Sequence, residues 1–171
     1  MLRQCGFVGG VLTCLFIVSQ APAQEFKEFS SAAGRFKVQM PGAPKESSLD
    51  VAGTTAKLFL VEVNDSAYLA SYADMPIPAN EGAEQTQMRL DGAVQGMVTN
   101  VNGKLTKETK IKLGQYPGRA VEAELPQANG YLRARIYMVD RRLYQLVIAG
   151  DKQTVYSKDA EKFLGSLVLI K

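Results

Sequence analysis

The stretch that decides the fold is YLRARIYMVDRRLYQLVI, residues 131–148. Its first half alternates apolar residues with arginine or tyrosine, a period of two that predicts a β-strand with one buried face. A charged segment at 140–142 separates it from a second apolar run, so the stretch predicts an antiparallel hairpin. We expect a three-residue turn, because it places Met138 beside Tyr144 on the core face and keeps Gln145 off the core. A two-residue turn would flip the whole second strand.

Further strands are predicted on the N-terminal side of this hairpin by the same period of two and by flanking turn residues. They cover residues 36–40, 54–63, 66–73, 105–113 and 119–125. Asn64-Asp65 is a tight-turn signal that joins two of these strands into a second hairpin. Tyr116-Pro117-Gly118 is expected to turn the chain between the last two strands.

Two segments have helical periodicity instead. The first runs from about residue 81 to 101, and the second begins after the candidate N-cap Ser157. Gly92 and Gly96 lie four residues apart in the first helix, and we expect them to let it approach a sheet closely. Together the elements predict an α+β fold with a single antiparallel sheet of about six to eight strands and two main helices, one mid-chain and one C-terminal.

The N-terminal residues 1–23 have the pattern of a secretory signal peptide, with a positive start, an apolar centre and a small-x-small cleavage site that ends at Ala23. We therefore expect an exported protein, periplasmic or extracellular, with one domain over residues 24–171 and no stable membrane span after cleavage. Two alternatives stay open: an uncleaved segment that acts as an anchor, and lipidation at Cys14.

Composition excludes several classes of chemistry. The chain has no histidine or tryptophan, and both of its cysteines, Cys5 and Cys14, lie in the predicted signal peptide. The exported part therefore lacks a thiolate nucleophile, an imidazole base and the nitrogen or sulfur ligands of a zinc site. The chain's 20 Lys and Arg are interspersed with 17 Asp and Glu, so no basic face for nucleic acid is expected. We predict no enzymatic activity and no cofactor.

Two groups of acidic residues could carry oxygen-based chemistry, but neither has the pattern for it. The possible hard ligands around the hairpin at 54–73 lack the spacing of an EF-hand loop, so no metal site is predicted. These ligands are Asp50, Glu62, Asn64, Asp65 and Asp74. Glu122 and Glu124 share a strand face, about 7 Å apart by strand rise, and we interpret them as solvated carboxylates, not as a catalytic pair.

The candidate binding site is a stripe of arginine and tyrosine on the strand at 131–138. If Leu132 and its apolar neighbours face the core, the four residues between them face outward together: Tyr131, Arg133, Arg135 and Tyr137. Arginine and tyrosine are enriched at binding hot spots, so we predict that this stripe binds a partner. Two alternatives stay open: a solvated strand face, and a helix layer over the stripe that would require acidic partners such as Glu122 or Glu124.

Several landmarks, taken in order, are similar to a known family. They are Phe29-Ser30-Ser31, the run GRFKVQMPGAP at 34–44, Arg135-Ile136-Tyr137, Leu143-Tyr144-Gln145-Leu146 and Phe163-Leu164-Gly165-Ser166-Leu167. In this order the chain resembles small exported bacterial domains of the photosystem II extrinsic protein (PsbP)-like fold, and it is similar to DcrB-type lipoproteins. The resemblance implies an antiparallel sheet flanked by helices and an accessory or binding role, and it carries no catalytic motif.

We therefore predict an exported, non-enzymatic accessory domain that contacts another protein of the cell envelope through a strand face. One alternative is a carrier of a small apolar or amphiphilic ligand, held between sheet and helix in a cavity of at least roughly 300 Å³. Met97, Met138 and Leu146 would line that cavity. An enzyme that uses only Asp, Glu, Lys or Tyr would instead need a cleft with two convergent carboxyl groups.

Overall fold

A computed structural model describes residues 25–51, 53–78 and 81–170. The predicted signal peptide, residues 1–23, lies outside the described residues. The elements follow in the order β1 (Lys27–Ser31), β2 (Phe36–Met40), β3 (Lys45–Val51), β4 (Thr54–Val63), β5 (Ser66–Asp74), α1 (Ala83–Asn100), β6 (Lys104–Leu113), β7 (Tyr116–Leu125), the 3-10 turn η1 (Pro126–Ala128), β8 (Gly130–Val139), β9 (Arg142–Gly150), α2 (Lys152–Val155), α3 (Lys158–Leu164) and β10 (Val168–Leu169).

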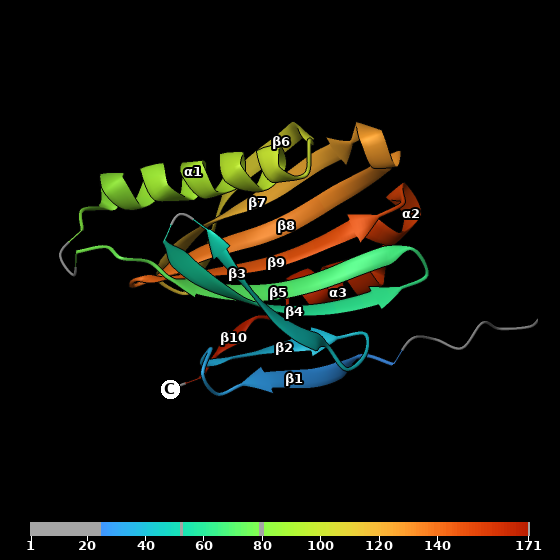
Figure 1. The fold of residues 1–171 in the computed structure, drawn as a ribbon, viewed down its shortest axis with the longest axis horizontal. Coiled ribbons are helices and arrows are strands. Elements are labelled where there is room, and N and C mark those ends of the chain that lie inside the picture. Colours follow the sequence, from blue (N-terminus) through green and yellow to red (C-terminus); the bar gives the residue numbers. More distant parts are fainter. Residues whose placement is uncertain (1–24, 52, 79–80, 171) are drawn as a thin grey trace, which may run out of the picture.

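The described strands form two antiparallel sheets, so the prediction of a single sheet is wrong. The larger sheet has seven strands in the order β3-β4-β5-β9-β8-β7-β6, and the smaller has the order β1-β2-β10 (Figure 1). The small sheet packs against a face of the large one, and β2 buries Phe36, Val38 and Met40 in the core between them. Alternation along β2 revealed a buried face, but it carries no information about which strand pairs with which.

The helices cover opposite faces of the large sheet. The main contacts of α1 are with β6, β7 and β8, whereas α2 and α3 contact β8, β9 and β2 on the other side. The mid-chain and C-terminal helices were predicted, and Ser157 caps α3 as expected by accepting a hydrogen bond from the Ala160 N–H at 3.1 Å. The four-residue helix α2 was not predicted, because it is too short to show a helical period.

The turn between β8 and β9 contains two residues, so the predicted three-residue turn is wrong. Val139 pairs with Arg142 across the hairpin, and Asp140 adopts φ 52°, a left-handed conformation that aspartate tolerates. As a result Tyr144 faces the α2–α3 side, while Gln145 lies half-buried on the α1 side opposite Ile136. Because β9 is apolar on both faces, its sequence does not indicate which face points which way.

The register separates the residues that were expected to line a ligand cavity. Met138 packs in the core beneath α1, and Leu146 packs in the separate core beneath α2 and α3. The large sheet lies between these two side chains, so Met97, Met138 and Leu146 cannot line one cavity.

Two local turn predictions have different outcomes. Asn64-Asp65 forms the tight turn between β4 and β5, and both residues have positive φ, 46° and 61°. Tyr116-Pro117-Gly118 does not turn the chain. These three residues begin β7, and the turn lies immediately before them, at Gly114 and Gln115. Gly114, with φ 60°, supplies the left-handed residue that this turn requires.

Gly92 and Gly96 do not bring α1 close to the sheet, so that prediction is wrong as well. Both are exposed, and a Cβ atom added at either position would meet no heavy atom within 4 Å. The face of α1 that packs on the sheet is formed by Leu90, Val94 and Val98. The two glycines therefore carry the conformational cost of glycine in a helix without a packing gain.

We predict that Gly92→Ala and Gly96→Ala each raise the free energy of unfolding by up to about 1 kcal/mol, because alanine is the better helix former. Urea unfolding of the two variants measures the change. Gly118→Ala is the matched control and should destabilise, since its Cβ would collide with the Ile136 carbonyl oxygen. A loss of stability in the two helix variants would contradict the interpretation that Gly92 and Gly96 make no packing contact.

Candidate functional site

The predicted Arg/Tyr stripe lies on the α2–α3 side of β8. Tyr131, Arg133, Arg135 and Tyr137 share this face, and the apolar residues between them pack beneath α1. The stripe is not uniformly open. Tyr137 is 4% exposed, and the side chains of Arg133 and Arg135 are 15% and 31% exposed.

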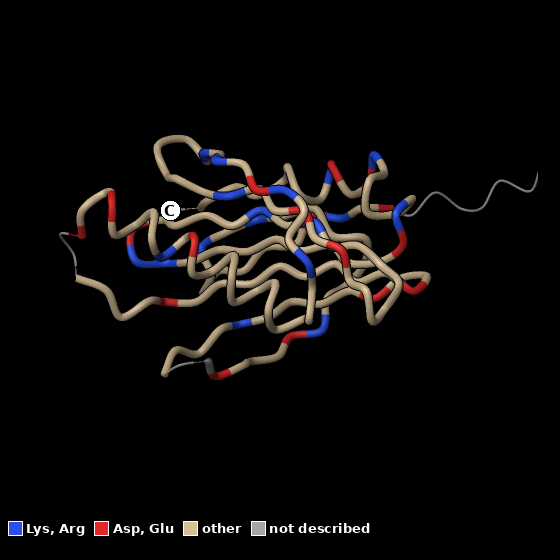
Figure 2. The backbone as a smooth tube through the Cα atoms, turned by 90° about the horizontal axis from the view of Figure 1, so that it is seen from above, with Lys and Arg blue, Asp and Glu red and all other residues tan. Residues whose placement is uncertain are grey.

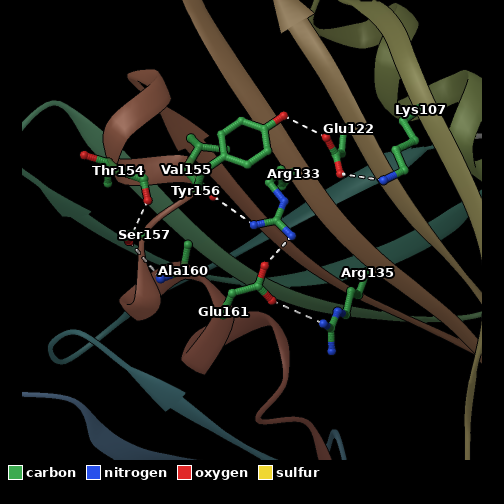
Figure 3. Close-up of polar contacts among 10 residues, drawn as sticks. All are labelled: Lys107, Glu122, Arg133, Arg135, Thr154, Val155, Tyr156, Ser157, Ala160 and Glu161. Carbon is green, nitrogen blue, oxygen red and sulfur yellow. Dashed lines mark hydrogen bonds and ion pairs between the residues drawn. The ribbon is translucent and has the colours of Figure 1, made fainter.

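One carboxylate of α3 joins the two arginines to the helix layer. Arg133 donates through Nη2 to Glu161 Oε1 at 2.5 Å and through Nη1 to the Val155 carbonyl oxygen at 3.2 Å (Figure 3). Arg135 reaches the other oxygen of Glu161 at a longer 3.4 Å. The acidic partner of the stripe is therefore Glu161, whereas the sequence suggested Glu122 or Glu124.

Tyr156, which follows α2, forms a second junction between helix and sheet. Its hydroxyl donates to Glu122 Oε2 at 2.7 Å, and the Arg133 guanidinium lies 5.0 Å from the centre of its ring. Lys107 Nζ on β6 lies 3.8 Å from Glu122 Oε1. Burial first, and then the hydrogen bond and charge of Glu122, raise the pKa of Tyr156 to about 12. Glu122 is thus a partner in the network, and its prediction as a solvated carboxylate is wrong.

We call this network around Glu161, Arg133 and Tyr156 the clamp, because its paired charges and hydrogen bonds join the helix layer to the sheet. The acids Glu122 and Glu161 both contact basic side chains, and the exposed Tyr156 ring lies against Tyr131 and Arg133 of β8. Across the whole backbone, Lys and Arg are likewise mixed with Asp and Glu (Figure 2). Within residues 25–51, 53–78 and 81–170, no group of three or more acidic, histidine or cysteine side chains could hold a metal ion.

Among the helices of the described residues, none is both long and apolar enough to cross a membrane.

No sequence pattern indicates a role for Arg119, whose side chain is 1% exposed on the α1 side of β7. Its Nη2 lies 2.5 Å from Asp91 Oδ1 on α1, and its Nε lies 2.8 Å from Glu108 Oε1 on β6. Arg119 therefore ties α1 to the sheet, as Arg133 ties α3 on the opposite face. An arginine near the start of a predicted strand is normally solvated, so only the three-dimensional placement of Asp91 reveals this role.

Part of the α2–α3 side of the sheet is left open. Lys107, Thr109 and Ile111 on β6 point to this side, and Thr109 lies directly opposite Ala120 on β7. Thr109 is exposed, while Ile111 and Ala120 are half-exposed. We call Thr109, Ile111, Ala120 and Arg135 the open strand face.

The arrangement of the elements matches a known fold. No protein-family model matches the chain, and no curated protein matches it by sequence. The solution structure of cyanobacterial PsbP (CyanoP) from Synechocystis sp. PCC 6803 is similar with a TM-score of 0.58 and 10% sequence identity, over 98% of this chain and 98% of that chain. The protein therefore has a PsbP-like fold, which confirms the resemblance seen in the sequence.

We predict that Glu161→Gln lowers the free energy of unfolding by about 1–2 kcal/mol, because the mostly buried Arg133 loses its charged partner. Chemical denaturation measures the loss. Glu46→Gln, at an exposed position on the edge strand β3, removes the same charge and should change stability by less than about 0.5 kcal/mol. Equal effects of the two substitutions would contradict the clamp.

The raised pKa of Tyr156 predicts how the stability of the protein changes at alkaline pH. Because its native pKa lies above the ordinary value of 10.0, the neutral phenol stabilises the native state fully below pH 10, and this contribution is lost as the pH rises through about 12. The stability difference between wild type and Tyr156→Phe should therefore shrink over this interval. An absorbance titration should also show one late-ionising tyrosine fewer in the variant. A stability difference that stays constant with pH would contradict the Tyr156–Glu122 contact.

Proposed function

We propose that the protein is an exported, non-enzymatic accessory domain that binds another protein of the cell envelope through the open strand face. The observation that carries the proposal is the division of the Arg/Tyr stripe by α2 and α3. Val155 and Glu161 of the helices hold Arg133, and Tyr137 is buried in the core, whereas Arg135 stays partly exposed beside Thr109, Ile111 and Ala120. The predicted signal peptide at residues 1–23 supports the assignment to the envelope.

The chemistry of the open strand face suits a protein partner with acidic side chains. Ile111 and Ala120 supply apolar area, and Arg135 and the neighbouring Lys107 supply positive charge. Their contacts with Glu161 and Glu122, at 3.4 and 3.8 Å, are longer than those of strong charge-assisted hydrogen bonds. Both cations can therefore exchange their present contacts for carboxylates of a partner. Apolar residues beside arginine are typical of protein interfaces.

The partner is expected to dock on the face of the sheet rather than add a strand to its edge. β6 is an edge strand of the large sheet, and it carries Lys104, Lys107, Lys110 and Lys112 together with a register shift between Leu105 and Lys107. Lysines and bulges on an edge strand oppose pairing with another chain. These lysines and the register shift thus protect the edge of the sheet.

Site-specific photo-crosslinking in the native envelope tests this function. A photoreactive residue at Thr109 should yield a discrete protein adduct, and Arg135→Ala should reduce its amount because one partner contact is lost while the Arg133–Glu161 bond remains. The control position is Met88, 66% exposed on α1. The proposal fails if Thr109 captures nothing, if Met88 captures the same protein, or if Arg135→Ala leaves the yield unchanged.

A further inference from the structure

Three arginines converge on a hollow at one end of the large sheet. The hollow has a volume of about 540 Å³ and is lined by Arg35 from the β1–β2 turn, Asp74 from the end of β5, and Arg141 and Arg142 from the β8–β9 hairpin. Val139 and Tyr116 complete one wall. Val139 continues the stripe of β8 beyond Arg135, and Tyr116 pairs with Leu113 of β6, so the hollow adjoins the open strand face.

Arg35 occupies a backbone conformation that disfavours arginine. Its φ is 53°, and it is the one residue of the described chain with positive φ that is not glycine, asparagine or aspartate. The turn is fixed by surrounding hydrogen bonds, since Tyr144 Oη donates to the Gly34 carbonyl at 2.7 Å and the Ile170 N–H donates to the Arg35 carbonyl at 2.9 Å. Asparagine would fit this position with less strain. The fold therefore does not account for an arginine here, whereas a function of its guanidinium would.

The Arg35 and Arg141 side chains are not engaged by other groups. Both residues are exposed, and within the described residues no hydrogen bond or ion pair reaches either guanidinium. Their positive charge affects Asp74, which also lines the hollow. The pKa of Asp74 is lowered first by its hydrogen bond with Arg142 and further by the charges of Arg142, Arg35 and Arg141. The exposed carboxylate of Asp140 also lines the hollow. Three arginines therefore face two aspartates there, and Arg35 and Arg141 are the two arginines outside the Arg142–Asp74 pair.

Arg142 gives this end of the sheet a rigid base. Its Nε and Nη2 both donate to the Asp74 carboxylate at 2.6 Å, and Nη1 donates to the Ala33 carbonyl at 2.9 Å. Its guanidinium also lies 4.7 Å from the centre of the Tyr72 ring. Arg142 thereby fixes the β1–β2 turn, and with it Arg35, relative to the β8–β9 hairpin that carries Arg141.

We infer that Arg35 and Arg141, held in place by Arg142, form an anion-binding site, and that carboxylates of the partner protein occupy it. The inference of an anion-binding site is based on the hollow and on the two free guanidinium groups. The assignment of its occupant to carboxylates of the partner protein rests on the proposed function. Arginine binds carboxylates through paired N–H donors, so two arginines at one hollow suit a short acidic segment. Docking on the open strand face would bring such a segment to the adjoining hollow.

The test is an NMR titration of the full chain with a hexaglutamate peptide at constant ionic strength. Saturable shifts of the Arg35 and Arg141 Nε–H resonances are expected, and Arg35→Asn with Arg141→Asn should weaken binding by roughly tenfold or more. The control, Lys45→Asn with Lys104→Asn, removes two exposed cations at the opposite edges of the large sheet. It should weaken binding by less than about twofold, because remote surface charges are screened. An equal loss in both double variants would overturn the site.

Two further measurements complete the test. Arg35→Asn should leave the Tm unchanged or higher, because it relieves the backbone strain, and a lower Tm would make Arg35 structural and overturn the inference. Inorganic phosphate should bind more weakly than the peptide, and equal or tighter binding would overturn the assignment to a protein carboxylate. Absence of peptide binding with intact crosslinking from Thr109 removes this inference alone. Peptide binding without crosslinking removes the proposed function and the assignment to a partner's carboxylates, and leaves the anion-binding site in place.

Discussion

The two-residue turn between β8 and β9 determines which side chains each face of the large sheet presents. With Val139 opposite Arg142, Tyr144 and Leu146 join the core under α2, α3 and the small sheet, while Leu143 joins the core under α1. Both faces of β9 are therefore apolar, and neither can be left to solvent. The three layers of the molecule follow from this constraint, because each face needs a separate cover (Figure 1).

Arginines on the covered faces need acidic partners, and these come from a helix for Arg119 and Arg133 and from the end of β5 for Arg142. Arg119 finds Asp91 on α1, and Arg133 finds Glu161 on α3. A mostly buried guanidinium without such a partner would be strongly unfavourable, so these pairs fix where the helices lie along the strands. Arg35 and Arg141 differ because they lie at the exposed end of the sheet, where nothing in the fold requires a charge. This contrast separates arginines that hold the structure from arginines that are available to a ligand.

The sequence predicted what depends on local periodicity and missed what depends on the pairing of distant segments. The strands at 54–63 and 66–73, the Asn64-Asp65 turn and both main helices follow from patterns within a few residues. The separate small sheet does not, because β2 alternates as it would in either sheet. At the site, the shared face of Tyr131 to Tyr137 was predictable from a period of two. Its cover by Glu161 was not, because that residue lies 28 positions from Arg133 along the chain.

The PsbP-like fold places these features but does not assign their roles, since one fold can carry many functions. The parts of this surface that the fold needs are recognisable by their contacts: the clamp of Glu161, Arg133 and Tyr156 joins helices to sheet, and Arg142 joins a turn to a hairpin. In the open strand face, Arg135 makes only a long contact with Glu161, and at the hollow the guanidinium groups of Arg35 and Arg141 have no hydrogen bond or ion pair within the described residues. The two surfaces adjoin each other at the same end of β8. Exposed apolar residues and unpaired arginines are each unremarkable alone. Their continuity over one surface, together with an arginine retained in a strained conformation, is what favours recognition of a partner over simple solvation.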